Sequence, residues 1–556
     1  MQTGTGMTLG IFMDNFFRFS IKNNLLAINF LLIFFLVWFF NIEILPFKNS
    51  GDFLFFVVLI FAFALYRPGW AFLFFIGTVA LENITLIPKE MGLMLRPYQL
   101  LFFLILLAIA IRFFVKRLNF SLPKLRWYDA AIVLIGFSSF LSIAVASDRL
   151  LSLKLSVVVF SFILLYFLTR IFIQDVEDVS RIAPFFLSSS LVIIFYGIWQ
   201  NILFAKGLNS FEVMPGRPNS TFSEADWLGI YIVILISAFY AIIFYLNKNS
   251  DNNKLSIFPP EADQPWAGNQ ILNPKSKKYF IFSILYITLL LSYILLIITV
   301  SRSAWLGVGI ATVVFLLATL FFGWEMFWRQ TVFIISAGIV SLLVVYVFHL
   351  TSFQLFNRIQ STGTGLQKIT IACSSELSSD SELNSDSVID NVSELEKYGC
   401  RHINLEDINQ ERDLGFEIRE IYRTDPNINI RSVIYQKSLE QIKAHPILGI
   451  GWGNIGNILG KDERGTGLNS SNIFLEIWLG SGILGLIAFL SVWLYILGRS
   501  ILGFFKAEDV LFKAFSLFVV ISWLGLTVAN LFNAGIMLGF LWVWMAIAIS
   551  PSIEKS

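Results

Sequence analysis

The chain has 556 residues, of which 56% are hydrophobic and only 14% are charged, with a net charge of +2. Soluble domains carry about 25% charged residues, so this balance excludes an ordinary soluble domain and predicts a protein with many membrane-spanning helices. The sequence contains no GxxxxGK[S/T] loop, HExxH or CxxC pattern, so we expect no nucleotide, no metal and no nucleic-acid partner.

Fourteen apolar runs follow one another along the chain, and most are long enough to span a bilayer as a helix. Two of them, 52–66 and 68–83, are short, so we expect about 12 to 14 spans. The other runs cover 24–45, 97–115, 129–147, 151–172, 182–203, 227–247, 279–299, 303–322, 331–349, 472–497, 509–531 and 534–550. The predicted fold class is an all-α polytopic membrane protein with one large loop before its last three spans.

Basic residues orient these spans. The stretch with Lys116, Arg117, Lys124 and Arg126 is strongly basic, and the positive-inside rule assigns it to the cytoplasm. Fourteen spans then place three polar regions on the opposite, outer face, namely 204–226, the turn at Arg302 and 350–471. The expected domains are therefore an N-terminal bundle (1–349), a large outer loop (350–471) and C-terminal transmembrane helices (472–550).

The large loop divides into two parts by composition. Residues 374–396 are rich in serine and acids, which is typical of a flexible tip. In the part 429–457, Tyr435, Leu439 and Ile442 recur at helical spacing, Pro446 ends the helix, and a glycine-rich turn follows.

Both cysteines of the chain, Cys373 and Cys400, fall in this loop. If the loop faces an oxidising compartment, the two cysteines can form a disulfide. Two free thiols remain the alternative, because a sequence does not give the geometry that a disulfide needs.

Three arginines, Arg217, Arg302 and Arg431, are each expected beside a membrane end on the outer face. Guanidinium groups bind phosphate through two parallel hydrogen bonds and stay charged at any working pH, so such a cluster suits a lipid diphosphate. The alternative is that each arginine reaches lipid headgroups or pairs with a nearby acid. Arg302 fits that alternative least, because its turn is short and apolar runs flank it.

Four residues are candidates for proton transfer. Glu224 and Asp226 follow Arg217 closely and could be its partners or a general base. Glu476 lies inside the apolar run NIFLEIWLGSG, where an ionisable residue has either a functional role or a structural pairing with an arginine. His445 precedes Pro446 at a predicted helix end, where a positive charge would complement the helix dipole.

The stretches SRSAWLGVG, RSVIYQKSLEQIKAHPILGIGWGN and SSNIFLEIWLGSGILGL together resemble the O-antigen ligase and polymerase superfamily. The resemblance implies a cofactor-free, metal-independent glycosyltransferase of the bacterial inner membrane, with its loop and active site on the periplasmic face. Its donor would be a glycan on undecaprenyl diphosphate, and its acceptor another glycan or a lipid A-core. Arg217, Arg302 and Arg431 would hold the diphosphate, and Asn472 would also contact substrate.

The chain departs from this family at one position. The ligases usually carry a His–Asn pair after the loop, with the histidine as the proposed base, whereas this chain has Ser471 and Asn472. A serine hydroxyl does not act as a base at neutral pH without activation. Glu224, Asp226, Glu476 or His445 would then supply the base, and polymerase or exopolysaccharide transfer is favoured over lipid A ligation.

Two other classes of function fit the same sequence. A polytopic transporter also has many spans and buried charges, although no inverted repeat is evident in the hydropathy. A non-catalytic glycan-assembly scaffold would keep the lipid site and lack the base.

Overall fold

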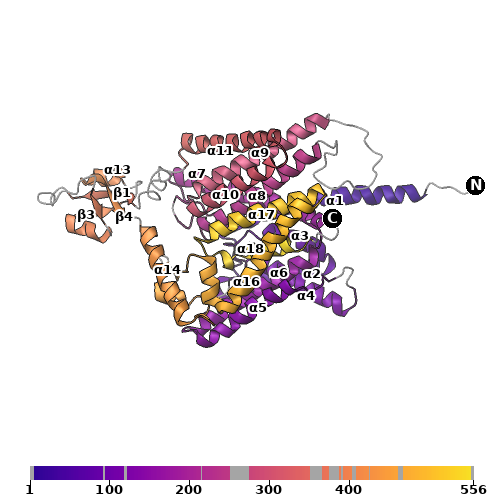
Figure 1. The fold of residues 1–556 in the computed structure, drawn as a ribbon, viewed down its shortest axis with the longest axis horizontal. Helices are drawn as coiled ribbons and strands as arrows, with labels where there is room; N and C mark the ends of the chain where they lie inside the picture. The colour runs from indigo at the N-terminus through magenta and orange to yellow at the C-terminus, as the bar shows by residue number, and fades with distance from the viewer. Residues whose placement is uncertain are drawn as a thin grey trace, which may run out of the picture.

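A computed structural model describes residues 6–91, 94–117, 122–214, 216–250, 274–350, 366–374, 387–389, 392–403, 408–424, 426–460 and 467–551. Within these residues, eleven helices are long and apolar enough to cross a membrane, and three shorter apolar helices accompany them (Figure 1). The prediction of an all-α polytopic membrane protein is confirmed.

The helices coincide with the fourteen apolar runs of the sequence. The three short ones are α2 (Ser50–Tyr66), α3 (Pro68–Thr78) and α18 (Gly539–Ile549). The long ones are α1 (Gly6–Asn41), α4 (Pro97–Phe114), α5 (Trp127–Leu141), α6 (Arg149–Phe172), α7 (Val176–Ala205), α8 (Ala225–Ser250), α9 (Pro274–Ile298), α10 (Arg302–Leu320), α11 (Trp324–Val347), α16 (Ile473–Lys506) and α17 (Val510–Asn530).

Local residues set where several of these helices begin. The side chains of Asn49 and Asp148 accept hydrogen bonds from the first backbone N–H groups of α2 and α6. Pro97 stands in the first turn of α4, where its missing N–H costs nothing. The late helices then pack among the early ones, α16 on α5 and α17 on α8 and α10.

The bundle has two chemically different ends. At the basic end, Arg126, Arg170 and Arg499 lie close enough to interact electrostatically, and Arg499 donates to the carbonyl of Ile549. At the other end, which we call the loop end, the long segment between α11 and α16 extends away from the helices, with α14 (Pro426–Ala444) at the left of Figure 1. Because the ends of the helices lie alternately at the basic end and the loop end, successive helices run in opposite directions.

The large loop contains a small sheet that the sequence analysis did not predict. Its strand order is β2–β4–β1–β3, with β1 (Leu366–Cys373) and β4 (Glu417–Thr424) antiparallel in the middle. The edges are β2 (Val388–Ile389) and β3 (Cys400–His402). Ile369, Ile371 and Ile421 form its buried core.

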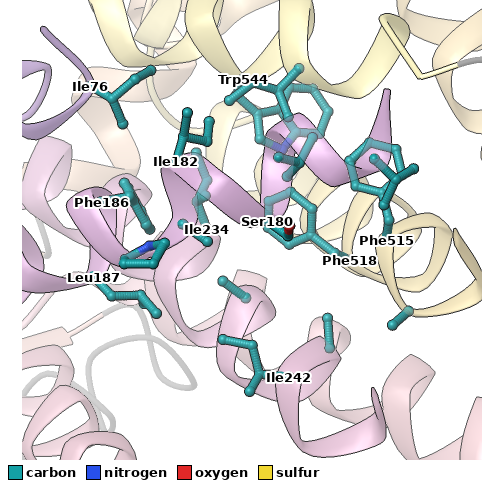
Figure 2. A pocket seen from close by; sticks show the side chains of 18 of the residues that line it. Ile76, Ser180, Ile182, Phe186, Leu187, Ile234, Ile242, Phe515, Phe518 and Trp544 are labelled. Carbon is teal, nitrogen blue, oxygen red and sulfur yellow. The ribbon is translucent and has the colours of Figure 1, made fainter. Parts of the chain in front are cut away.

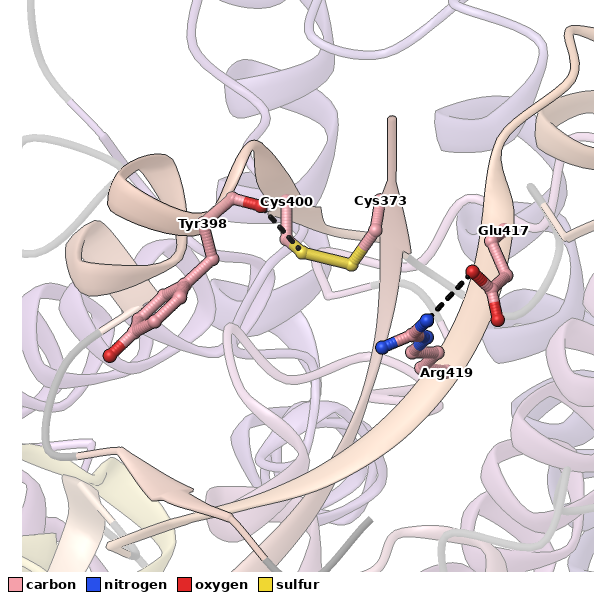
Figure 3. The surroundings of a disulfide bond; sticks show 5 residues. All are labelled: Cys373, Tyr398, Cys400, Glu417 and Arg419. Atoms are coloured by element: carbon pink, nitrogen blue, oxygen red, sulfur yellow. Dashed lines mark hydrogen bonds and ion pairs between the residues drawn. A yellow bond between two sulfur atoms is a disulfide. The ribbon is translucent and has the colours of Figure 1, made fainter. Parts of the chain in front are cut away.

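Cys373 and Cys400 are joined by a disulfide across the β1–β3 pair, with an S–S distance of 2.03 Å (Figure 3). On the neighbouring strand β4, Arg419 donates to Glu417 at 2.9 Å. The disulfide fixes the edge strand to the middle of the sheet.

The acidic stretch 374–396, expected to be a flexible tip, has two parts. Residues 375–386 lie outside the described residues. Beyond them, β2 is an edge strand of the sheet and the 3₁₀ helix η3 (Val392–Tyr398) packs against the sheet, with Leu395 fully buried. In this second part, Leu395 and Ile389 belong to a small apolar core that composition alone did not reveal.

The glycine-rich turn after α14 packs into a bend of α16. Gly482 adopts a left-handed conformation (φ 68°) inside α16, and the next residue, Ile483, donates its N–H to the carbonyl of Ile447 at 3.1 Å. The fully buried Trp452 packs on Gly480. The motif that carries the family resemblance therefore includes a structural joint between the loop and the bundle.

Candidate functional site

Asp226 is the centre of a polar cluster at the loop end. It stands in the first turn of α8, and its Oδ2 accepts a hydrogen bond from Nη2 of Arg217 at 3.2 Å. Arg217, which is 9% exposed, also donates from Nε to the carbonyl of Thr299 at 3.2 Å. The loop between α7 and α8 is thus joined to both α8 and the turn before α10.

That turn is held from a second side. Ser301 precedes α10 and donates its hydroxyl to Oδ1 of Asp226 at 2.5 Å. Gly229 on α8 permits this approach, because a Cβ there would lie 2.6 Å from the Cβ of Ala304. Arg302, half-buried, begins α10 directly after Ser301. Since α8 and α10 both begin here, their positive dipole ends add to the arginine charges.

The cluster continues onto α14 and α17. The guanidinium of Arg431 lies over the ring of Phe532, 5.4 Å from its centroid, and its charge acts on Asp226. One turn later, Tyr435 donates to the carbonyl of Leu531 at 3.0 Å. Burial raises the pKa of Tyr435, and the charge of Arg431 opposes that rise. These contacts fix α14 beside the end of α17.

Asp226 pairs directly with one of the three predicted arginines, and the other two are related to it less directly. Arg217 is bound to it, Arg431 acts on it electrostatically, and Arg302 follows the serine that donates to it. A large oxyanion such as a diphosphate fits the positive charge assembled there. The five N–H groups of the Arg217 guanidinium exceed the three that its hydrogen bonds to Thr299, Met214 and Asp226 use.

Two of the predicted site residues, Glu476 and Asn472, form hydrogen bonds at the start of α16. Glu476 is 7% exposed, and its Oε2 accepts from the N–H and hydroxyl of Ser470 at 2.9 and 2.6 Å. Asn472 caps the helix by accepting from the N–H groups of Phe474 and Leu475, while its amide donates to the carbonyl of Leu531. Both residues stabilise the chain reversal that brings α16 beside α17.

Of the remaining candidates, Glu224 lies close to Asp226 in the chain, whereas His445 lies far from Arg431 along α14. Glu224 stands just before α8, two residues from Asp226, and its carbonyl accepts from Leu228 at 3.2 Å. His445 is exposed and follows the last residue of α14. With a rise of 1.5 Å per residue, it lies about 21 Å along the helix from Arg431.

Glu212, which was not predicted from the sequence, stabilises the turn before Arg217 through hydrogen bonds. Its Oε2 accepts from the N–H of Gly216 at 2.8 Å and from the hydroxyl of Ser210 at 3.2 Å. Burial raises the pKa of Glu212 to about 7, although the two hydrogen bonds oppose the shift. The sequence held only a weak signal, an acid five residues before Arg217.

Comparison with known families identifies part of this architecture. Residues 287–490 match the family model described as O-Antigen ligase. These residues form an O-antigen ligase family domain. No curated protein and no solved structure shows a significant match to the chain. The predicted resemblance is confirmed for this domain, and it supports a ligase-like or polymerase-like role in glycan assembly at a membrane.

The O-antigen ligase domain contributes only part of the polar cluster. It covers the second half of α9, all of α10, α11 and α14, the loop sheet and the first half of α16, and so includes Ser301, Arg302 and Arg431. Arg217 and Asp226 precede it in the chain. The structure therefore joins the domain to α8 and the α7–α8 loop through the contacts of Asp226.

Among the described residues, no group of three or more His, Cys, Asp or Glu side chains is placed to hold a metal ion. The charges that the site offers to an anion come from arginines and helix N-termini.

Proposed function

We propose that the chain transfers a glycan from undecaprenyl diphosphate, without a metal, to another glycan or to a lipid A-core acceptor. The polymerase-like reaction is the favoured one, because Ser471 stands where the ligases usually have a histidine. The reaction would take place at the loop end of the bundle, on the periplasmic face of the bacterial inner membrane.

The observation that carries the proposal is the pairing of Arg217 with Asp226, whose carboxylate also feels the charge of Arg431 and accepts from Ser301, the residue before Arg302. Lipid headgroups would not require Arg217 to be buried and oriented by two hydrogen bonds. An oriented guanidinium can stabilise the charge that develops on a departing diphosphate, which is the form of catalysis that preorganised donors provide.

The base in this proposal is Glu224. His445 lies about 21 Å along α14 from Arg431. Glu224 precedes α8 beside the cluster, where a carboxylate can take the proton from an acceptor hydroxyl. The acceptor would approach from the side of the large loop.

The decisive experiment uses the full chain in lipid vesicles with an undecaprenyl-diphosphate-linked oligosaccharide, and reads product length on a gel. A ladder of longer lipid-linked glycans would support the polymerase, and label moving to an added lipid A-core acceptor would support the ligase. Transfer to neither acceptor would contradict the proposal.

The role of arginine is tested in the same vesicles by Arg302→Lys, which keeps the charge and loses the planar fork. We expect product to fall strongly while the protein remains in the membrane. Arg181→Lys is the matched control, because Arg181 is an exposed arginine on α7 that pairs with Asp178. A normal yield from Arg302→Lys would refute the role of Arg302 in holding the diphosphate.

A further inference from the structure

A cavity of about 400 Å³ lies between α3, α7, α8, α17 and α18, away from the polar cluster (Figure 2). Its walls are almost entirely apolar, and Ile182, Ile234, Phe515 and Trp544 point into it. Ser180 and Tyr245 contribute the hydroxyl groups of the lining. A volume of this size is in the range of known ligand sites, about 300–1,000 Å³.

The cavity occupies the half of the bundle nearest the basic end. On α8, which starts at the loop end, the lining residues run from Ile234, just before the middle of the helix, to Tyr245 in its second half. On α17, which starts at the basic end, they lie in the first half, from Leu511 to Phe518. The lining of α7 likewise belongs to its first half.

The length of the cavity matches one leaflet. Eleven residues of helix separate Ile234 from Tyr245, which gives about 16 Å along α8. Half of a bilayer's hydrocarbon core is about 15 Å thick. A space of that length along the helices has about the dimensions of the hydrocarbon chain of one leaflet.

Three packed rings separate the cavity from the polar cluster. Phe222, Tyr231 and Phe540 are at most 4% exposed, and their ring centroids lie 5.3 to 5.9 Å apart. Phe540 lines the cavity, whereas Phe222 lies in the loop that carries Arg217. A lipid tail whose diphosphate is bound at the loop end therefore has no path through these rings into the cavity.

The chemistry of the walls selects the occupant. A buried water needs two to four polar partners, and these walls offer few. If the cavity is empty, its lining atoms lack dispersion contacts on that side, which is energetically unfavourable. The surrounding solvent is lipid hydrocarbon, which can supply those contacts without any polar group being buried.

We propose that this cavity binds one acyl chain of a phospholipid from the leaflet at the basic end. The chain lies along α8, with its terminal carbons near Ile76 and Phe540 and its ester-proximal carbons near Ser180 and Leu511. The site is independent of the proposed glycan transfer. It would make this lipid part of the packing between α7 and α8, the two helices that flank the loop with Arg217.

The test uses the full chain in vesicles with phospholipids that carry a diazirine at one defined acyl carbon. After irradiation, the labelled residues are mapped by mass spectrometry. We expect a diazirine near the ester to label the region of Ser180 and Leu511, and a terminal diazirine to label Ile76 and Phe540. Equal labelling of both regions by both probes, or of neither, would overturn the proposal, and this measurement needs no variant.

A filled cavity gives the second test. Ala238→Phe places a ring into the cavity, and we expect at least a fivefold loss of label from its lining with no change at Val313, which is 57% exposed on α10. Ala110→Phe on the exposed face of α4 is the matched control. Unchanged cavity labelling in a folded Ala238→Phe protein would refute the site. So would labelling of the lining by a photoreactive polyprenyl diphosphate in preference to the phospholipid.

Discussion

Replacing Asp226 with asparagine tests whether this carboxylate organises the arginine cluster. The substitution keeps the shape of the side chain and removes its charge. It turns an acceptor of the Arg217 N–H group into either a donor or a weaker, neutral acceptor. The change leaves Arg217, which is 9% exposed, without its carboxylate partner, while the Ser301 hydroxyl can still find an acceptor.

The magnitude follows from the geometry. Breaking a fully buried ion pair costs about 3–5 kcal/mol. Here the side chains of Arg217 and Asp226 are 10% and 31% exposed, so water recovers part of that loss and we expect about 2 kcal/mol. The effect on transfer should be larger, about 10²-fold to 10³-fold, because Arg217 would no longer be oriented toward the departing diphosphate.

The assay compares glycan transfer per folded molecule with the free energy of unfolding. Asp129→Asn is the matched control, because Asp129 forms a buried ion pair with Arg170 at the opposite end of the bundle. We expect that variant to lose stability and keep its activity per folded molecule. The reasoning fails if Asp226→Asn retains transfer within about twofold, or if the two variants lose activity equally.

Three further predictions concern the base, the Arg217 loop and the joint in α16. Glu224→Gln should reduce transfer more than Ser471→Ala, measured in vesicles, and the reverse ranking would return the base to the start of α16. Folded Glu212 keeps its proton up to a pKa of about 7, above the ordinary 4.5, so the free energy of unfolding should fall as pH rises from 4.5 to 7. Thermal unfolding of Glu212→Gln should show a smaller fall in that range, and an unchanged slope would contradict the assignment. Gly480→Ala should destabilise the protein by at least 1–3 kcal/mol, because the new Cβ would lie 2.3 Å from the Trp452 ring. Gly498→Ala in the same helix, with nothing within 4 Å, is its control and should be neutral or stabilising.

The sequence predicted the bundle well because its signal is long and simple. Each span is an apolar run of membrane length, and a run of that kind forms a helix regardless of its neighbours. It did not predict the loop sheet, although Ile369, Ile371 and Cys373 alternate with less apolar residues in β1 as a half-buried strand requires. The partner strand β4 begins more than forty residues later, and pairing over that distance leaves no local pattern.

The site was predictable in part for a related reason. An arginine beside an apolar run is conspicuous, so Arg217, Arg302 and Arg431 could be selected from the sequence alone. Ser301 and Glu212 could not, since a serine or an acid in a polar loop has no distinctive context. Their importance arises only when folding brings Ser301 to Asp226 and Glu212 to the turn before Arg217. The left-handed Gly482 was hidden in the same way inside an apolar run.

The serine at the usual histidine position has a structural consequence for the mechanism. Ser471 is in the left-handed region (φ 49°), a conformation that histidine and asparagine adopt more readily than most residues. Its carbonyl accepts from Tyr435 at 3.4 Å, so this position borders α14 beside the arginine cluster. A histidine here would place a base at the site, whereas serine leaves that function to a group on another element. The proposed base, Glu224, stands just before α8 and precedes the O-antigen ligase domain in the chain. In the proposed function, a base at Glu224 in place of one on α16 would keep the same arginines and change only the side from which the acceptor hydroxyl loses its proton.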